Sequence, residues 1–327
     1  MTEPRPAAPL VSVVIPLYNE ELNVEPLVKR LEHVLRRTGS PWELVFALDP
    51  SPDRTRERLL ELMEQGYPIR LLIFSRRIGK PLSLLAGLDH AVGDVCVIID
   101  ADLQDPPELI EAMLATWRDG YDVVIPQRVA RKGEHFLYLK AAELFYWLLE
   151  KISEVPVPRN TGDFRLLDAR VVREVCRFRE RHGFLRGMTA LAGFKTALLP
   201  YERDARHAGR TQIPLRGAVN IALDGIVPFS RAPVRWMLAL GLIFVLLAVG
   251  SGLAGLTVGL LSGMPEQWPI WFACWLNLML SGIVLSGMGI LGEYLVRTYE
   301  EARHRPLYIV HELHEADSLP RSFRRPC

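Results

Sequence analysis

The sequence lacks several features that would place the protein in other classes. Its 327 residues contain four cysteines, Cys96, Cys176, Cys274 and Cys327, which lie far apart in the chain. This spacing argues against a zinc site or a disulfide framework and favours a reducing compartment. The net charge at pH 7 is only +1, which gives no electrostatic reason to expect nucleic acid as a partner.

Charge is also absent from two long stretches near the C-terminus. Residues 236–261 and 268–292 contain no charged side chain. As helices they would be roughly 37–39 Å long, which exceeds the ~30 Å hydrocarbon core of a bilayer. We therefore predict a transmembrane hairpin within 234–296, and the alternative is a pair of buried helices in a large soluble core. Segment 1–10 is polar and has no apolar run typical of a signal peptide, so we expect an N-terminal tail there.

Arginines surround the predicted hairpin, whereas its linker contains no lysine or arginine. The flanking arginines are Arg231, Arg235, Arg297, Arg303 and Arg305. The positive-inside rule then predicts a multi-pass protein of the inner (cytoplasmic) membrane with both termini cytoplasmic, including a C-terminal tail at 297–327. Gly255 and Gly259 would let the two helices of the hairpin, or two protomers, approach closely, which leaves a homo-oligomer open.

Residues 11–126 alternate between short apolar runs and helical periodicity. The runs that predict strands are 11–16, 43–48, 70–75, 95–100 and 122–126. The segments with helical periodicity lie at about 22–37, 54–65, 81–92 and 107–118. This alternation predicts an α/β, Rossmann-like domain with a mostly parallel sheet and helices on both faces.

Polar and charged residues follow four of the predicted strands. In open parallel sheets, ligands bind beyond the carboxyl ends of the strands. Asp100 and Asp102 follow the fourth strand and are two residues apart, so in extended backbone both can point the same way. Such hard oxygen ligands suit Mg²⁺ or Mn²⁺ holding a diphosphate. A solvated acidic loop remains the alternative.

Five segments resemble a known family. They are PLYNEE at 16–21, SRRIGK at 75–80, DADLQDPPEL at 100–109, GYDVVIPQR at 120–128 and TGDFRLLD at 161–168. Together they resemble family 2 glycosyltransferases of the GT-A fold, in particular the polyprenyl-phosphate glycosyltransferases. The resemblance implies transfer of a glycosyl unit from a nucleotide-sugar, preferably a UDP-sugar, to the phosphate of a membrane polyprenol such as undecaprenyl phosphate. It further implies reaction at the cytoplasmic face with inversion of the anomeric centre.

The resemblance also suggests roles for individual residues. The expected metal ligands are Asp100, Asp102 and Gln104. The expected donor-binding residues are Pro16, Tyr18, Glu20, Asp49, Lys80, Asp100, Arg206 and Arg210. The expected acceptor-phosphate ligands are Arg128, Arg131 and Lys140, and the guanidinium groups of the two arginines can bind phosphate bidentately. Asp163 and Asp102 are expected at the reacting centre.

Two further stretches have one apolar helical stripe each. They are 136–152, inside a predicted catalytic domain at 11–213, and 214–233, which follows it. We interpret both as interfacial helices lying on the membrane, and packing on the domain core is the alternative.

Two other functions remain open. A processive polysaccharide synthase would also combine an acid motif with spans, but it needs more spans, and the glutamine of its usual motif is missing before Arg235 and Trp236. A catalytically impaired membrane scaffold is favoured only by departures from the family pattern, such as Leu48 where an aspartate is usual.

Overall fold

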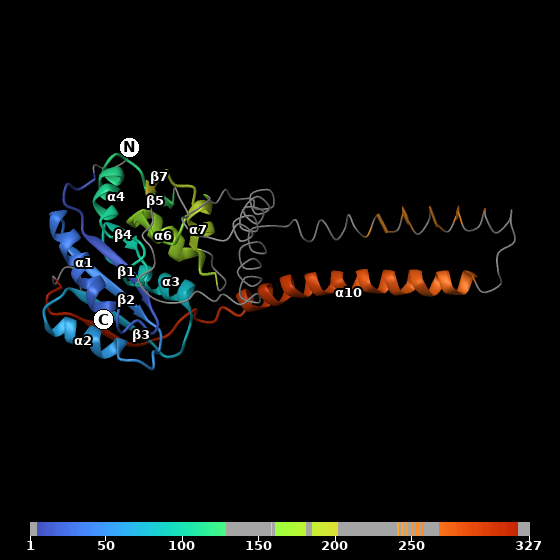
Figure 1. Ribbon diagram of the computed structural model, residues 1–327, viewed down its shortest axis with the longest axis horizontal. Coiled ribbons are helices and arrows are strands. Elements are labelled where there is room, and N and C mark those ends of the chain that lie inside the picture. The colour runs from blue at the N-terminus through green and yellow to red at the C-terminus, as the bar shows by residue number, and fades with distance from the viewer. Residues whose placement is uncertain are drawn as a thin grey trace. The chain divides into compact units, whose positions relative to one another are not determined.

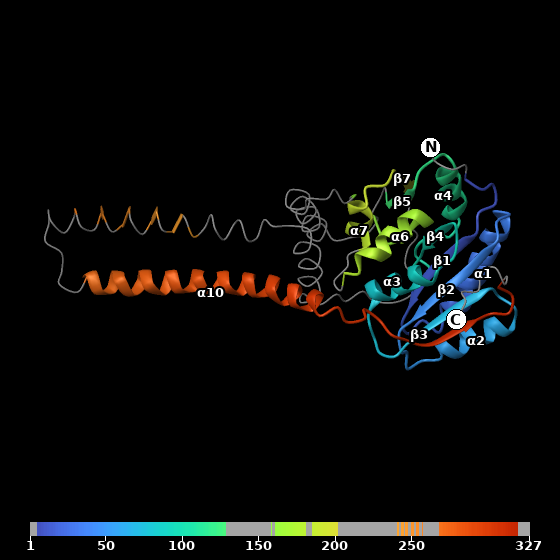
Figure 2. The same ribbon diagram turned by 180° about the vertical axis from the view of Figure 1, so that it is seen from behind.

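The computed structural model describes residues 5–128, 158, 161–180, 185–201 and 268–319, with separate positions between 241 and 257. These residues form two compact units (Figures 1 and 2). The first unit holds the sheet and its helices, and the second holds a long apolar helix.

One sheet of eight strands organises the first unit, in the order β7-β5-β6-β4-β1-β2-β3-β8. The strands are β1 (Val11–Leu17), β2 (Trp42–Leu48), β3 (Ile69–Phe74), β4 (Val95–Ile98), β5 (Val123–Arg128), β6 (Arg165–Asp168), β7 (Thr196–Tyr201) and β8 (Val310–Glu315). Only β6 and β8 run antiparallel to their neighbours within this sheet. The prediction of a mostly parallel sheet is therefore confirmed.

Helices cover both faces of this sheet. Among the described residues of the first unit, these are α1 (Val24–Arg37), α2 (Thr55–Glu64), α3 (Lys80–His90), α4 (Leu109–Arg118), α6 (Ala169–Phe178) and α7 (Leu185–Leu191). One core cluster joins α1, α2 and α4 to one side of the central strands. A second cluster joins α3, α6 and α7 to the other side. The result is a three-layer α/β unit, which agrees with a GT-A-like fold.

The local sequence explains these elements. Six of the seven residues of β1 are buried, because a central parallel strand is covered on both faces and so reads as a continuous apolar run. In α1 the buried residues recur three or four positions apart, which gives one apolar stripe facing the sheet. Asp168 caps α6, and its carboxylate accepts the backbone N–H of Arg170 at 2.9 Å.

A row of buried polar groups crosses four neighbouring strands. The Ser12 hydroxyl on β1 donates to Glu43 on β2 at 2.5 Å. Glu43 pairs with Arg70 on β3 at 3.3 Å, and both side chains are fully buried. Arg70 also pairs with Glu315 on β8, its partner in the strand register. Because a misaligned strand would leave one of these charges unpaired, the row favours one register of β8.

The C-terminal segment thus differs in part from the tail expected at 297–327. Residues 310–315 add an antiparallel edge strand to β3, which lies about 240 residues earlier in the chain. The Tyr308 hydroxyl donates to Asp89 at 2.6 Å, and the Ser75 N–H donates to the Ile309 carbonyl at 3.1 Å. This segment forms a strand because it makes polar contacts with residues that are distant in the sequence. No local pattern in residues 297–327 predicts such contacts.

The second unit contains α10 (Trp268–Ala302). Within the described residues this is the one helix whose length and apolar composition suffice for a membrane span. It begins where the second predicted span begins and continues ten residues past residue 292. A hairpin of two spans is not confirmed, because most of the first predicted span, 236–261, lies outside the described residues. The predicted interfacial helices at 136–152 and 214–233 also lie outside them.

Candidate active site

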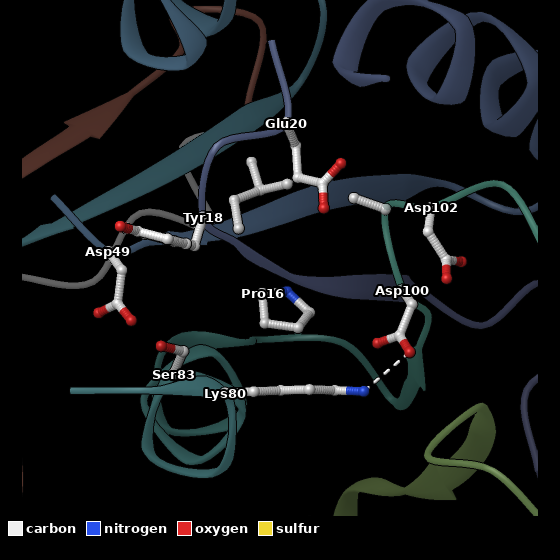
Figure 3. A pocket seen from close by; sticks show the side chains of 10 residues that line it. Pro16, Tyr18, Glu20, Asp49, Lys80, Ser83, Asp100 and Asp102 are labelled. Carbon is white, nitrogen blue, oxygen red and sulfur yellow. Dashed lines mark hydrogen bonds and ion pairs between the residues drawn. The ribbon is translucent and has the colours of Figure 1, made fainter. Parts of the chain in front are cut away.

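A pocket opens at the carboxyl ends of β1, β2 and β4, where the sequence predicted a ligand site. Its lining includes seven of the predicted site residues (Figure 3). These are Pro16, Tyr18, Glu20, Asp49, Lys80, Asp100 and Asp102. The other lining residues are Leu17, Ser83 and Ala101. The parallel strand order explains the convergence, since β4, β1 and β2 are adjacent in the sheet although distant in sequence.

Asp49 fixes the loop that leads into α3. Its carboxylate accepts the backbone N–H groups of Ile78 at 3.0 Å and Gly79 at 2.9 Å, and the residue is 3% exposed. Gly79 has a φ of +85°, a conformation that favours glycine, and it stands directly before Lys80. The loop is therefore held so that Lys80, the first residue of α3, reaches the pocket.

Lys80 joins two of the predicted site acids. Its Nζ lies 2.8 Å from Asp100 Oδ2 and 2.8 Å from Asp163 Oδ2. Figure 3 shows the first of these contacts, with Lys80 crossing the pocket from α3 toward the end of β4. Burial opposes the charge of Lys80, but the two carboxylates together raise its pKa above the ordinary value of 10.5. Lys80 is thus a positive charge fixed between two acids.

The two acids bound by Lys80 differ in their electrostatics. Burial would raise the pKa of Asp163, but the charges of Lys80, Arg186 and Arg165 hold it well below the ordinary value of 3.8. Arg186 on α7 donates to Asp163 through its Nε at 2.9 Å. In Asp100, burial raises the pKa, and Lys80 offsets that effect only in part. Asp163 is therefore the firmly ionised member of the pair.

The pKa of Glu20 is also raised above its ordinary value. Burial raises its pKa above 4.5, although the Asn23 amide, which donates to Glu20 at 2.6 Å, lowers it. The negative charges of Asp102 and Asp100 raise it further. The carboxylates in the pocket therefore repel one another, and a bound cation would reduce this repulsion.

The turn that follows β4 has a strained backbone. Leu103 has a φ of +59°, in the left-handed region that leucine rarely adopts. Its side chain packs against the first core cluster, which offsets a cost of ~1–3 kcal/mol for such a conformation. The Gln104 N–H donates to Asp102 Oδ1 at 3.2 Å across this turn. Gln104 itself is 7% exposed and does not belong to the pocket lining.

Arg128, at the end of β5, belongs to a neighbouring cluster. Its Nε donates to the Tyr201 hydroxyl at 3.1 Å, and that hydroxyl donates to Asp105 at 2.9 Å. One Arg128 amino group lies 3.7 Å from Asp105, which is 2% exposed. The guanidinium also passes close to Gly162, where an added Cβ would lie 3.1 Å from it. Arg128 is therefore held beside the residue that precedes Asp163.

Four predicted site residues lie outside the described residues, namely Arg131, Lys140, Arg206 and Arg210. Conversely, sequence reasoning missed Tyr201, Arg186 and Asp105 as supports of the site. Asp105 stands within the DADLQDPPE motif, so its position was visible, but its partner Tyr201 is 96 residues away. No spacing rule connects such a pair.

Metal-binding capacity follows from the oxygen ligands at the pocket. In the described part of the chain, no three His, Cys, Asp or Glu side chains converge as a metal site. Mg²⁺, however, is usually held by one or two carboxylates together with phosphates of the substrate. Asp100 and Asp102, both in the pocket lining, fit that type of site.

A doubly covered, mostly parallel sheet with an acidic pocket beyond its strand ends defines the class of α/β enzymes that bind ligands at this edge. Comparison with known proteins makes the assignment narrower. The glycosyl transferase family 2 description matches residues 12–176. The chain belongs to glycosyltransferase family 2, which confirms the predicted enzyme class.

The similarity to related proteins extends over nearly the whole chain. A glycosyltransferase of Bacillus subtilis is 40% identical over 304 residues, covering 91% of this chain and 92% of that protein. The bactoprenol glucosyl transferase of Shigella phage SfV is 36% identical over 302 residues, covering 92% and 97%. Among solved structures, glucosyl-3-phosphoglycerate synthase from Mycobacterium tuberculosis is 19% identical with a TM-score of 0.44, covering 66% of this chain and 77% of that one. The family match and the bactoprenol glucosyl transferase relative confirm the predicted resemblance to polyprenyl-phosphate glycosyltransferases.

Proposed function

We propose that the protein transfers a glycosyl unit from a nucleotide-sugar, preferably a UDP-sugar, to the phosphate of a membrane polyprenol such as undecaprenyl phosphate. The observation that carries this proposal is the acidic pocket at the ends of β1, β2 and β4 in a family 2 glycosyltransferase. The chain is similar over 92% of its length to a bactoprenol glucosyl transferase, and this similarity supports the choice of acceptor.

The donor binds in the acidic pocket. In this proposal Pro16, Tyr18, Glu20 and Asp49 surround the nucleoside and Lys80 faces the diphosphate, since all five residues line the pocket. Tyr18 stacks against Arg77, whose guanidinium carbon lies 3.8 Å from the ring centroid, so this aromatic wall is fixed in place. Arg206 and Arg210 add positive charge at the diphosphate in this proposal.

A divalent cation, Mg²⁺ or Mn²⁺, would be held by Asp100 and Asp102, with Gln104 as the third expected ligand. When bound, such an ion stabilises the charge that develops on the departing nucleoside diphosphate. Through such an ion, Asp100 and Asp102 would hold the diphosphate end of the donor at the end of β4, beside Asp163, which Lys80 links to Asp100.

The acceptor phosphate needs little activation. The second pKa of a phosphate monoester is about 6, so most of it is already a dianion near pH 7. Asp163 is paired with Lys80 and Arg186, which favours an orienting role over that of a strong base. Arg128 positions the acceptor phosphate, with Arg131 and Lys140 as further ligands. Direct attack by the phosphate oxygen on the sugar would invert the anomeric centre.

The acceptor lies in a bilayer, and α10 supports a membrane location. Its 35 residues would extend roughly 52 Å, which exceeds the ~30 Å hydrocarbon core. We place the protein in the inner membrane with the catalytic unit and both termini cytoplasmic and with 236–261 as a further span.

The direct test uses the full chain in detergent with undecaprenyl phosphate, Mn²⁺ or Mg²⁺, and a panel of labelled UDP-sugars and GDP-sugars. One donor should give a product that partitions into organic solvent and contains both sugar and lipid phosphate. Asp102→Asn should reduce its formation at least a hundredfold, a loss of ~2.7 kcal/mol in transition-state stabilisation. Asp119→Asn, a matched change at an exposed turn, should leave the rate unchanged. Product formed without polyprenyl phosphate would refute the acceptor, and full activity of Asp102→Asn would refute the cation site.

A further inference from the structure

Lys80 contacts an acid that is also expected to bind the divalent cation. Lys80 Nζ lies 2.8 Å from one oxygen of Asp100 and 2.8 Å from one oxygen of Asp163. Asp100 is also an expected ligand of the divalent cation. An ammonium group and a metal ion cannot both occupy the same face of one carboxylate oxygen, since each needs its lone pairs and the two repel each other.

The surrounding charges show what the lysine neutralises. Glu20, Asp100 and Asp102 line the pocket, and Asp163 is linked to it through Lys80. Among the described basic residues, Arg186 pairs with Asp163, and Lys80 is the partner of Asp100 in the ion pairs formed. Without Lys80, the partly exposed carboxylate of Asp100 would therefore have no paired cation among the described residues until a metal ion binds.

The backbone holds Lys80 in this position. It is the first residue of α3, and the two residues before it are bound through their N–H groups to Asp49. The side chain itself is 42% exposed, so its ammonium group has room to leave Asp100 while the backbone stays in place. The arrangement combines a fixed backbone position with a charge that a competing cation can displace.

We propose that Lys80 is a resident counter-ion that competes with the divalent cation for Asp100 and gives way when cation and nucleoside diphosphate bind together. The displaced ammonium group stays paired with Asp163 and turns toward the diphosphate oxygens. The cation therefore binds weakly to the empty protein and tightly in the presence of the nucleotide. Lys80 is in this sense a positioning residue that couples the two ligands. This inference rests on the proposed cation site at Asp100 and Asp102.

The experiment measures Mn²⁺ binding to the full chain in detergent by electron paramagnetic resonance, with and without UDP. For the wild-type protein we expect UDP to tighten Mn²⁺ binding. In Lys80→Met, Mn²⁺ alone should bind about tenfold more tightly than to the wild type, because the competing charge is gone. The tightening caused by UDP should shrink by a similar factor, because the ammonium group no longer reaches the diphosphate.

Three further variants keep the result interpretable. Lys80→Arg retains a cation and should behave like the wild type, and Lys80→Gln should behave like Lys80→Met. Lys29→Met removes an exposed lysine paired with Glu25, and it should change the affinity for Mn²⁺ neither with nor without UDP. The melting temperature of each variant is measured without Mn²⁺, to confirm that the protein compared is folded.

The outcomes separate this inference from the proposed function. If Lys80→Met and Lys80→Gln bind Mn²⁺ alone no more tightly than the wild type, Lys80 is not a competitor and the inference is wrong. If neither the wild type nor any variant binds Mn²⁺ in the presence or absence of UDP, the cation site itself is wrong. Tighter binding in both variants, with the wild-type pattern retained in Lys80→Arg, supports the exchange.

Discussion

The buried pair between Arg70 and Glu43 provides a quantitative test of how this sheet is held together. Both side chains are fully buried, and Arg70 lies 3.3 Å from Glu43 while also reaching Glu315 on the C-terminal strand. In Arg70→Met, Glu43 keeps the Ser12 hydroxyl and the Val92 N–H as donors but loses its cation. Glu315 is 20% exposed, so water can solvate it once Arg70 is gone.

Removing one partner of a buried ion pair costs about 3–5 kcal/mol, because the other charge stays buried. That is a large part of a total stability of about 5–15 kcal/mol. For a unit of this size, 1 kcal/mol corresponds to about 2–4 °C in melting temperature, so Arg70→Met should melt roughly 6–20 °C lower. Thermal unfolding of the full chain in detergent measures this shift.

A double variant and a surface control make the reasoning refutable. Glu43→Gln combined with Arg70→Met keeps an acceptor for Ser12 and removes the unpaired charge, so it should recover at least half of the lost stability. Arg56→Met removes an exposed pair with Glu312, also on β8, and should change the melting temperature little, because water solvates both charges. A double variant as unstable as Arg70→Met, or a single variant as stable as Arg56→Met, would contradict the electrostatic explanation.

Two further predictions follow from the site. The pKa of Glu20 lies above 4.5 in the folded protein, mainly because the carboxyl is buried. Between the unfolded and the folded pKa, the folded protein therefore holds a proton that the unfolded chain has released. The stability due to this proton is present below pH 4.5 and is lost as pH rises through the folded pKa. The melting temperature of the wild type in EDTA should therefore fall over that range relative to Glu20→Gln, and a constant difference would count against the assignment. Gly162→Ala places a Cβ 3.1 Å from the Arg128 guanidinium, so we expect the KM for polyprenyl phosphate to rise about tenfold, or ~1.4 kcal/mol, with the donor KM unchanged. An equal rise in both KM values would mean that Gly162 does not act through the acceptor phosphate.

The elements that sequence reasoning found share one physical property. β1 to β5 lie in continuous or nearly continuous apolar runs, because the sheet that contains them is covered on both faces. Helices α1 to α4 begin and end close to the predicted ranges, because their periodicity reports the face that packs on the sheet. The acids after β4 were found for the same reason, since an apolar strand that stops at Asp100 indicates where the sheet ends.

The elements that sequence reasoning did not find depend on distant partners. β7 and β8 have alternating or partly exposed residues and become strands by pairing with β5 and β3. The supports of the site are of the same kind. Tyr201 holds Arg128, and Arg186 holds Asp163, through contacts whose partners are separated by 73 and 23 residues. The strength of such a contact depends on its geometry, which is absent from the local pattern.

The sequence by itself therefore determined the class of fold, the enzyme family and the set of acids at the strand ends, because apolar runs and short motifs are local properties of the chain. Only the tertiary structure decided that Lys80 stands between Asp100 and Asp163 and that a strand after α10 completes the sheet beside β3. Both depend on which distant groups come within hydrogen-bonding distance once the layers pack. Charge and hydrogen bonding act over a few ångströms in space, regardless of how many residues separate the partners along the chain.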